Sequence, residues 1–393
     1  MKEPLDLAAL PRRSATSPRW RDLWQQQLER LYASPRLYRW SLSTPLTRWV
    51  TRRRTQRLFD LMAGFVHSQV LLGCVRLDLF HLLFQAPADL TTIAQRVDMP
   101  APAVQRLLLA AVSVGLLEHR SQGRFGLGPL GVPLVTHPGI SQMIEHNHLL
   151  YEDMRDPLGF LRNTWQGSMA AYWPYAHARP AAEHTGPEPF RRYSELMAAS
   201  QSFVVQEILR SYPFGKHRCV LDVGAGQGGF VLALAQRTAH LRFQLFDLPP
   251  VLDLARKALQ DQGLDQRLTY HPGSFLHDTL PPGADLITLV RVVHDHPDDV
   301  VRQLLKKVHD TLPPGGALLL AEPMANPAGP PDASSDAYFH FYLLAMGAGR
   351  LRSPDELRRL MHEAGFHPVE RLANAMPIHT QLLVAHKSRC LPS

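Results

Sequence analysis

The chain has 393 residues, of which 45% are hydrophobic, which is enough to fill the cores of two domains. No uncharged apolar run reaches about eighteen residues, and the N-terminus lacks the apolar region of a secretory signal, so we expect no membrane-spanning helix and a cytoplasmic location. Three isolated cysteines provide neither a disulfide framework nor a metal-ligand spacing.

Positive charge is concentrated at the N-terminus. Residues 1–60 contain thirteen Lys and Arg against five Asp and Glu, whereas the rest of the chain has 29 basic and 30 acidic residues. Aromatic residues alternate with these arginines, namely Trp20, Trp24, Tyr32, Tyr38, Trp40 and Trp49. This mixture suits the interface of an anionic bilayer and predicts peripheral membrane docking by an extension over residues 1–57. Two other interpretations stay open: a solvated or partner-packed extension, and a nucleic-acid contact.

The next segment indicates a helical domain with a small β-wing. Residues 58–84 are apolar at helical spacing and predict one or two core helices, with too many Asp, Arg and His interruptions to span lipid. Two helices are predicted within residues 90–110, and residues 115–127 read as the wing. In DNA-binding winged helices the second helix enters the major groove. Here residues 103–114 are nearly all apolar, so we expect this helix to pack against protein and expect no nucleic-acid partner.

An aromatic-rich segment over residues 151–189 follows, and we expect it to close over a substrate site. It contains Trp165, Tyr172, Trp173 and Tyr175. Together with the winged helix it would form a dimerisation and lid domain over residues 58–189.

From residue 190 onward, helices and strands alternate, which predicts a Rossmann-like α/β domain over residues 190–393. A helix over residues 190–209 leads to a first strand that begins at Cys219. Further strands are predicted at residues 243–246, 268–270, 285–290, 317–321, 369–371 and 380–385. The last two should pair antiparallel.

The first strand of this domain runs through Asp222 into a glycine turn at Gly224, Gly226 and Gly229. Glycine allows the positive φ that such a turn needs and lets a ligand approach the backbone. The spacing matches both a dinucleotide fingerprint and an S-adenosylmethionine site, and an ordinary tight turn is the plain alternative. Asp222 favours S-adenosylmethionine, because a carboxylate suits its ammonium and sulfonium better than a pyrophosphate. Asp247, at the end of the second strand, is placed to accept ribose hydroxyls.

Reactive side chains follow the fourth strand, in the segment RVVHDHPDD at residues 291–299. His294 is the candidate base, because imidazole accepts protons near neutral pH, and Asp295 is placed to bind a substrate hydroxyl. Glu322, at the end of the next strand, would orient the imidazole. Two alternatives stay open, a divalent-metal site and a helix cap or surface cluster. We expect no metal, because no further cluster completes a shell.

These motifs resemble those of the S-adenosylmethionine-dependent O-methyltransferases typified by plant caffeate and animal acetylserotonin methyltransferases. DVGAGQGG, FDLPPVL, GSF, LVRVVHDHPDD and LLLAEP occur in that family's order, and the resemblance spans about residues 58–390. It implies a winged-helix domain that mediates homodimerisation and a proton acceptor at His294. It also implies cofactor contacts at Gly224, Asp247, Leu248, Gly273, Ser274, Phe275 and Arg291.

Two positions depart from the family pattern. The family's Gly-Asp adenine motif is Gly273-Ser274 here, so the resemblance implies that an acidic contact is lost or weakened. The second glutamate that flanks the histidine in plant members aligns near Leu351, which would leave Glu322 as the only flanking carboxylate.

The N-terminal stretches LYRWSLSTPLTRW and RRRTQRLFDLMAGF resemble the branch that methylates 1-hydroxycarotenoids in photosynthetic bacteria. This resemblance implies a carotenoid tertiary alcohol as the acceptor, a substrate that resides in the bilayer. Two rival functions are kept: methylation of another lipophilic acceptor, such as a bacteriochlorophyll intermediate or a polyketide or phenolic hydroxyl, and a winged-helix regulator that only senses the cofactor.

Overall fold

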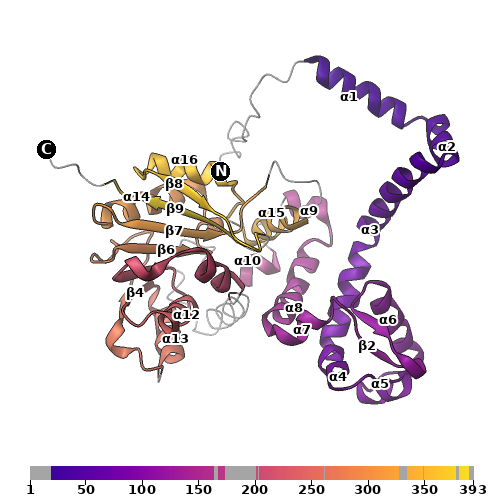
Figure 1. Cartoon of the computed structure of the whole chain (residues 1–393), viewed down its shortest axis with the longest axis horizontal. Coiled ribbons are helices and arrows are strands. Elements are labelled where there is room, and N and C mark those ends of the chain that lie inside the picture. Colours follow the sequence, from indigo (N-terminus) through magenta and orange to yellow (C-terminus); the bar gives the residue numbers. More distant parts are fainter. Residues whose placement is uncertain are drawn as a thin grey trace. The chain divides into compact units, whose positions relative to one another are not determined.

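The computed structural model describes residues 19–162, 167–172, 201, 203–260, 262–326, 334–347, 349–377 and 380–388 (Figure 1). The chain divides into two compact units, residues 1–71 and 72–393, and each is described by itself.

Three helices build the N-terminal unit: α1 (Arg19–Tyr32), α2 (Pro35–Ser43) and the larger part of α3 (Pro45–Arg76). Proline at the first position of α2 and α3 suits a helix start, because its missing N–H would have no partner there. The apolar and aromatic side chains of this N-terminal unit are largely exposed, as at Trp20, Trp24 and Trp49. Arginines stack on three aromatic rings: Arg21 on Trp20, Arg53 on Trp49 and Arg54 on Tyr32.

Helix α3 is longer and more exposed than predicted. It is continuous through residues 57 and 58, where the sequence suggested a domain boundary. Burial within this chain begins only at Leu72, and the apolar side chains before it are exposed, namely Leu58, Phe59, Leu61, Met62, Phe65 and Val66. The expected core helix is therefore wrong for residues 58–66, because helical periodicity reports an apolar face but not which surface covers it.

One helix among the described residues, Thr47–Arg76, is long and apolar enough to cross a membrane by length and composition alone. The sequence criterion of an unbroken uncharged run rejected it, because Asp60 interrupts the apolar stretch.

The predicted winged helix is present. Its elements are α4 (Leu79–Gln85), α5 (Leu90–Arg96), α6 (Ala101–Ser113), β1 (Leu117–His119), the 3-10 turn η2 (Ser121–Gly123) and β2 (Phe125–Leu127). The two strands pair antiparallel as a wing. The side chain of Asp89 caps α5 by accepting the amide of Thr92 at 2.8 Å. Helix α6 buries Val104 and Leu108, as expected of a packing helix.

Four helices follow the winged helix in the chain: α7 (Val132–Thr136), α8 (Pro138–Asp153), α9 (Pro157–Arg162) and α10 (Ser168–Tyr172). Together with α15 (Ser334–Met346), α8, α9 and α10 supply a buried apolar cluster. Most of the predicted lid, with Trp165, Trp173 and Tyr175, lies outside the described residues, as does the start of the helix predicted at residue 190.

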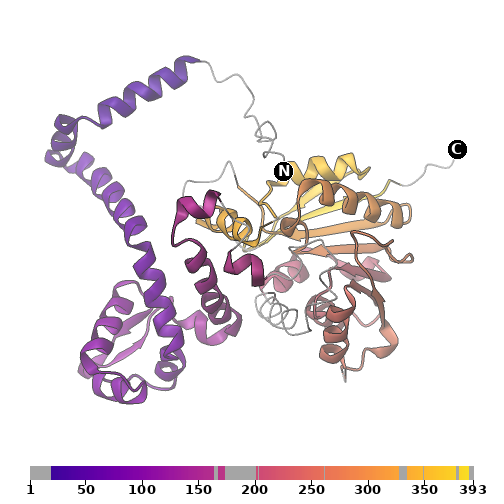
Figure 2. The same ribbon diagram turned by 180° about the vertical axis from the view of Figure 1, so that it is seen from behind.

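A seven-stranded sheet forms the centre of the α/β part, in the order β5-β4-β3-β6-β7-β9-β8. Figure 2 shows the same ribbon from behind. The strands are β3 (Cys219–Val223), β4 (Arg242–Asp247), β5 (Leu268–Pro272), β6 (Leu286–Val290), β7 (Ala317–Glu322), β8 (Val369–Leu372) and β9 (Gln381–His386). The first five in this chain order run parallel, whereas β9 is antiparallel to both β7 and β8, as predicted for the last pair.

Helices pack against both faces of this sheet, because alternate strand residues point to opposite sides. One core contains residues of the 203–211 helix, α12 (Gly229–Arg237) and α13 (Pro249–Leu259). The other contains residues of α14 (Asp298–Thr311) and α16 (Pro354–Glu363). The 3-10 turns are η5 (Phe214–Lys216), η6 (Asp265–Arg267) and η7 (Val293–Asp295). The predicted Rossmann-like domain after a helical winged-helix domain is confirmed.

The direction of chain progression reverses at β3, which lies between β4 and β6. In open α/β sheets, ligands bind at the carboxyl ends of the strands beside such a reversal. The candidate site residues stand at this edge: Gly224 follows β3, Asp247 ends β4, Arg291 follows β6 and Glu322 ends β7.

Candidate active site

The glycine turn after β3 has the left-handed backbone that only glycine adopts readily. The φ angles of Gly224, Gly226 and Gly228 are 74°, 56° and 77°. A Cβ at Gly224 would lie 2.6 Å from a methyl group of Val292, so the turn packs tightly against the segment that carries His294. A Cβ at Gly226 would meet nothing within 4 Å, so the turn opens onto free space at that position.

Asp247 holds this turn in place. Its Oδ2 accepts the amide of Gly226 at 2.8 Å, and its Oδ1 accepts the amide of Leu248 at 2.7 Å. Burial raises the pKa of Asp247 to about 6, although the bonds from Gly226 and Leu248 favour the charged form. Each carboxylate oxygen keeps a second lone pair, which leaves room to accept a ligand hydroxyl.

Asp222 lies inside the sheet, 2% exposed. Its Oδ1 accepts the hydroxyl of Thr288 at 2.6 Å, which links β3 to β6. Burial raises its pKa to about 7, and the neighbouring charge of Asp247 adds to that rise. The bond to Thr288 is a structural contact that the sequence did not reveal, and contact with a cofactor ammonium stays a prediction.

A carboxylate stands beside the Gly273-Ser274 turn even though Ser274 is not acidic. The Oδ2 atom of Asp278 accepts the amide of Ser274 at 2.8 Å and would lie 3.2 Å from a Cβ at Gly273. Phe275 packs edge-on against the ring of His296, with the ring centroids 5.1 Å apart. Phe275 therefore connects the Gly273-Ser274 turn to the segment that carries His294, a contact that the sequence did not predict.

His294 is buried, 6% exposed, in the turn η7 after β6. Its Nδ1 lies 2.5 Å from Oε2 of Glu322, so the predicted orienting contact is present. The other oxygen of Glu322 accepts the amides of Val292 and Val293, at 2.8 and 2.7 Å. Glu322 thus binds the ring and the backbone of the same turn, which leaves Nε2 of His294 for proton transfer.

Glu322 is not the only carboxylate beside the imidazole. Oδ1 of Asp295 lies 3.3 Å from Nε2 of His294, which corrects the expectation that Glu322 stands alone. Burial lowers the pKa of His294, but Asp295 and Glu322 outweigh it and the net pKa is raised. Burial raises the pKa of Asp295 in turn.

The surface-cluster and helix-cap alternatives do not describe these residues. His294 and Asp295 are buried, and the residue that caps α14 is Pro297, with no side-chain cap bond. Within the described ranges, no group of three or more His, Cys, Asp or Glu gathers as a metal site would need.

Arg291 has a left-handed φ of 59°, and its amide donates to the carbonyl of Ala321 at 2.9 Å. Its positive charge acts on both His294 and Asp295 and partly offsets the rise in their pKa values. The side chain therefore belongs electrostatically to the same site, where the sequence predicted a cofactor contact.

An apolar and aromatic wall adjoins the histidine turn. Helix α15 contacts η7, and its Tyr342 and Met346 are buried together with Leu351. Tyr338 Oη donates to Asn147 Oδ1 on α8 at 2.9 Å. Burial raises the pKa of Tyr338 to about 12. This wall was not identified from the sequence, because α8 and α15 are nearly two hundred residues apart in the chain.

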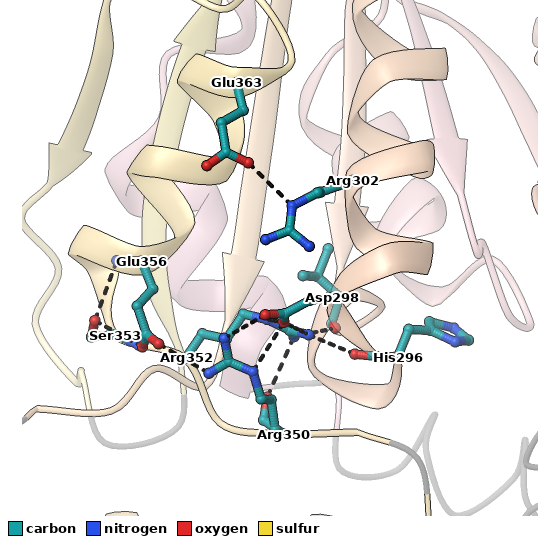
Figure 3. A network of polar contacts seen from close by, with 9 residues as sticks. His296, Asp298, Arg302, Arg350, Arg352, Ser353, Glu356 and Glu363 are labelled. Atoms are coloured by element: carbon teal, nitrogen blue, oxygen red, sulfur yellow. Dashed lines mark hydrogen bonds and ion pairs between the residues drawn. The ribbon is translucent and has the colours of Figure 1, made fainter. Parts of the chain in front are cut away.

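Two further residues that the sequence did not single out, Arg350 and Arg352, donate to the carbonyls of the same turn, and Asp298 of the RVVHDHPDD segment accepts from both (Figure 3). Only the fold brings the two arginines to His294.

The chain is similar to known methyltransferases in sequence and in fold. Residues 151–367 match the O-methyltransferase domain family, and residues 59–137 match the O-methyltransferase dimerisation domain family. A demethylspheroidene O-methyltransferase of Rhodobacter capsulatus is 40% identical over 91% of this chain and 88% of its own length. One from Cereibacter sphaeroides is 38% identical over 88% of this chain and 91% of its own. Human N-acetylserotonin methyltransferase in complex with SAM has the same fold, with a TM-score of 0.71 and 23% identity over 85% of this chain and 98% of that one.

Proposed function

The chain belongs to the O-methyltransferase family, and from this premise we propose that it transfers a methyl group from S-adenosylmethionine to the tertiary 1-hydroxyl of an acyclic carotenoid. The observation that carries the proposal is the similarity to two demethylspheroidene O-methyltransferases along about nine tenths of the chain. This similarity does not favour the regulator or the other lipophilic acceptors.

The turn after β3 fits the cofactor, because Gly226 faces open space while Gly224 and Gly228 have no room for a side chain. Gly224 and Gly226 would lie against the methionine part, and Asp247 with Leu248 would lie at the ribose. The segment Gly273–Phe275 would hold the adenine, with Arg291 beside the sulfonium side. Asp222 would support the turn through the sheet. The bound cofactor supplies an electrophilic methyl group.

His294 acts as the base in this proposal. The acceptor oxygen forms a bond to the methyl carbon while the carbon–sulfur bond breaks, and the hydroxyl proton moves to Nε2 of His294. The Nδ1 atom donates to Glu322, which stabilises the resulting imidazolium. A tertiary alcohol is a weak acid, so the proton leaves as attack proceeds. Asp295 is placed to bind the hydroxyl, since its carboxylate lies beside Nε2.

The apolar wall supports an aliphatic acceptor. Leu351 and Met346 are buried in the apolar cluster beside the histidine turn, and an apolar wall there would suit a polyene with geminal methyl groups. A carboxylate at position 351 would instead favour a polar ring.

The dimerisation-domain match supports a homodimer, in which a second copy covers the exposed apolar side chains of α3, such as Phe59, Leu61 and Phe65. We assign residues 1–57 to an extension, 58–189 to the dimerisation and lid domain, and 190–393 to methyl transfer. The extension would dock on the cytoplasmic face of an anionic membrane, because exposed tryptophans and arginines share its helices. A bilayer-resident substrate gives such docking a purpose.

The direct test is methyl transfer from labelled S-adenosylmethionine. The full chain is incubated with membranes that contain 1-hydroxycarotenoids and, separately, with a panel of phenols. We expect label in the carotenoid ether. Label that enters only phenols would exclude the carotenoid as the acceptor.

A further inference from the structure

The turn that carries His294 is held from both sides of its backbone. On the amide side, Oε1 of Glu322 accepts the N–H groups of Val292 and Val293. On the carbonyl side, the bonds come from Arg350 and Arg352, which flank Leu351 and for which the sequence predicted no role.

The side chain of Arg352 donates two of the hydrogen bonds to the carbonyls of this turn (Figure 3). Its Nη1 donates to the carbonyl of Val293 at 2.9 Å, and its Nη2 donates to the carbonyl of His296 at 2.7 Å. These carbonyls flank His294 on either side. The carbonyl of His294 itself accepts the backbone amide of Arg350 at 3.0 Å. The side chain of Arg352 is only 1% exposed, so water does not replace these bonds.

The charge of this buried guanidinium is compensated by Asp298, the first residue of α14. Nε of Arg352 donates to Asp298 Oδ1 at 2.8 Å, and Arg350 adds two bonds to the same carboxylate, both at 2.9 Å. Burial raises the pKa of Asp298, but the bonds from Arg350 and Arg352 outweigh it and lower the pKa to about 2. The carboxylate therefore stays ionised at any pH at which His294 changes charge.

The segment of residues 350–352 is also bonded to the N-terminus of α16. Nη1 of Arg350 bonds Oε1 of Glu356 at 3.0 Å, and Oε2 of Glu356 accepts the amide of Ser353 in the capping box of α16. Residues 350–353 thus connect the N-termini of α14 and α16 to the histidine turn.

We propose that Arg352 is a positioning residue for methyl transfer: its guanidinium fixes the carbonyls of Val293 and His296, so that Nε2 of His294 keeps the orientation in which it accepts the substrate proton. The proposal rests on the proposed function, in which His294 is the base. Arginine suits the role because its planar fork donates in several fixed directions from one charge, whereas lysine is a point charge.

The test compares Arg352→Lys and Arg352→Met in the full chain with Arg302→Met as the matched control. Arg302 lies on α14 and is exposed, and its partner among the described residues is Glu363 on α16, at 3.2 Å. We expect kcat to fall about 10- to 100-fold in both Arg352 variants, because small displacements of a catalytic group are costly. The Kd for S-adenosylmethionine should change much less than kcat, since Arg352 bonds neither the glycine turn nor Asp247. The control should keep both values.

A second readout needs no acceptor. The proton that Nδ1 of His294 donates to Glu322 should give a low-field resonance in the proton NMR spectrum, and this resonance should move or broaden in Arg352→Lys but not in Arg302→Met. A folded Arg352→Lys protein with wild-type kcat and an unmoved resonance would overturn the proposal. Equal losses of kcat and cofactor affinity would overturn it as well, because they indicate general damage. If Arg352→Met does not fold, Arg352→Lys carries the test. A wild-type protein that leaves carotenoids unmethylated would count against the proposed function alone.

Discussion

Nδ1 of His294 lies 2.5 Å from Oε2 of Glu322, and the two residues are 28 positions apart: His294 lies in the turn η7 after β6, and Glu322 ends the neighbouring strand β7. This pair assigns different tasks to the two ring nitrogens: Nδ1 is engaged by a buried carboxylate, and Nε2 faces Asp295 and the substrate side. The raised pKa of His294 follows from the two carboxylates together, against the opposing effect of burial.

His294→Ala should lower kcat about 100- to 10,000-fold, the usual range for a general base. Its affinity for S-adenosylmethionine should be retained, because the amides of Val292 and Val293 still bind Glu322. Single-turnover transfer of labelled methyl measures the first quantity, and calorimetric titration with the cofactor measures the second. Substantial turnover by the alanine variant would remove His294 from the base role.

The pH dependence of kcat should show a limb that falls on acidification at a pH above the ordinary histidine value of about 6.5, because only neutral imidazole accepts the proton. The same raised pKa stabilises the folded chain below the unfolded value, and that stabilisation is lost as pH rises through the folded pKa. Glu322→Gln removes a charge that raises this pKa but keeps an oxygen for the backbone amides, so the limb should move to lower pH. We would abandon this electrostatic account if the limb stayed in place or moved upward.

Gly226→Ala should weaken S-adenosylmethionine binding at least about tenfold, because the new Cβ would occupy the open space over the turn and strain a residue with φ 56°. Gly263→Ala is the matched control, since Gly263 has a φ of 68° and equally open surroundings away from the site. Both variants carry similar backbone strain, so their melting temperatures should fall alike. Equal cofactor Kd values in the two variants would show that Gly226 does not line the cofactor site.

Gly349→Ala should destabilise the fold by about 1–3 kcal/mol and lower kcat, because a Cβ there would overlap the carbonyl oxygen of His294. Gly215→Ala, where a Cβ meets nothing within 4 Å, should be close to neutral. Urea unfolding and kcat measured side by side test this. An unaffected Gly349→Ala protein would mean that the 349–352 segment moves easily away from the turn.

Trp20→Ser combined with Trp24→Ser should reduce sedimentation with anionic phosphatidylserine vesicles severalfold, because each exposed indole adds apolar area at the bilayer interface. Gln25→Ser with Gln26→Ser on the same helix is the control and should leave sedimentation unchanged. Cofactor affinity should be equal in all three proteins. Identical sedimentation of the tryptophan variant and the wild type would argue for the solvated extension.

Local sequence pattern was sufficient to predict several of the candidate site residues. The glycines of the turn, the acid that ends β4, and the histidine after β6 are each tied to a strand end, and the carboxyl ends of parallel strands meet at one edge. For that reason His294 and Glu322 could be paired from the sequence. Resemblance in the motifs then extended the interpretation to the family.

Other features depend on contacts between distant segments, and the sequence carries no periodic signal for them. Helical periodicity predicts a core face for α3, but its side chains over residues 58–66 are exposed, because periodicity does not reveal which surface covers an apolar stripe. Asp295 became a second carboxylate beside the imidazole only through the 3-10 turn, and Asp278 reached Ser274 only through its loop.

By itself, therefore, the sequence determined the glycine turn after β3, His294 after β6 and Glu322 at the end of β7 as candidate site residues, since each depends on local order along one strand and its end. Only the tertiary structure decided how His294 is held. The donors for the carbonyls of Val293 and His296 come from Arg352, which lies some sixty residues away. Burial and compensation of its charge by Asp298 are properties of packing between helices.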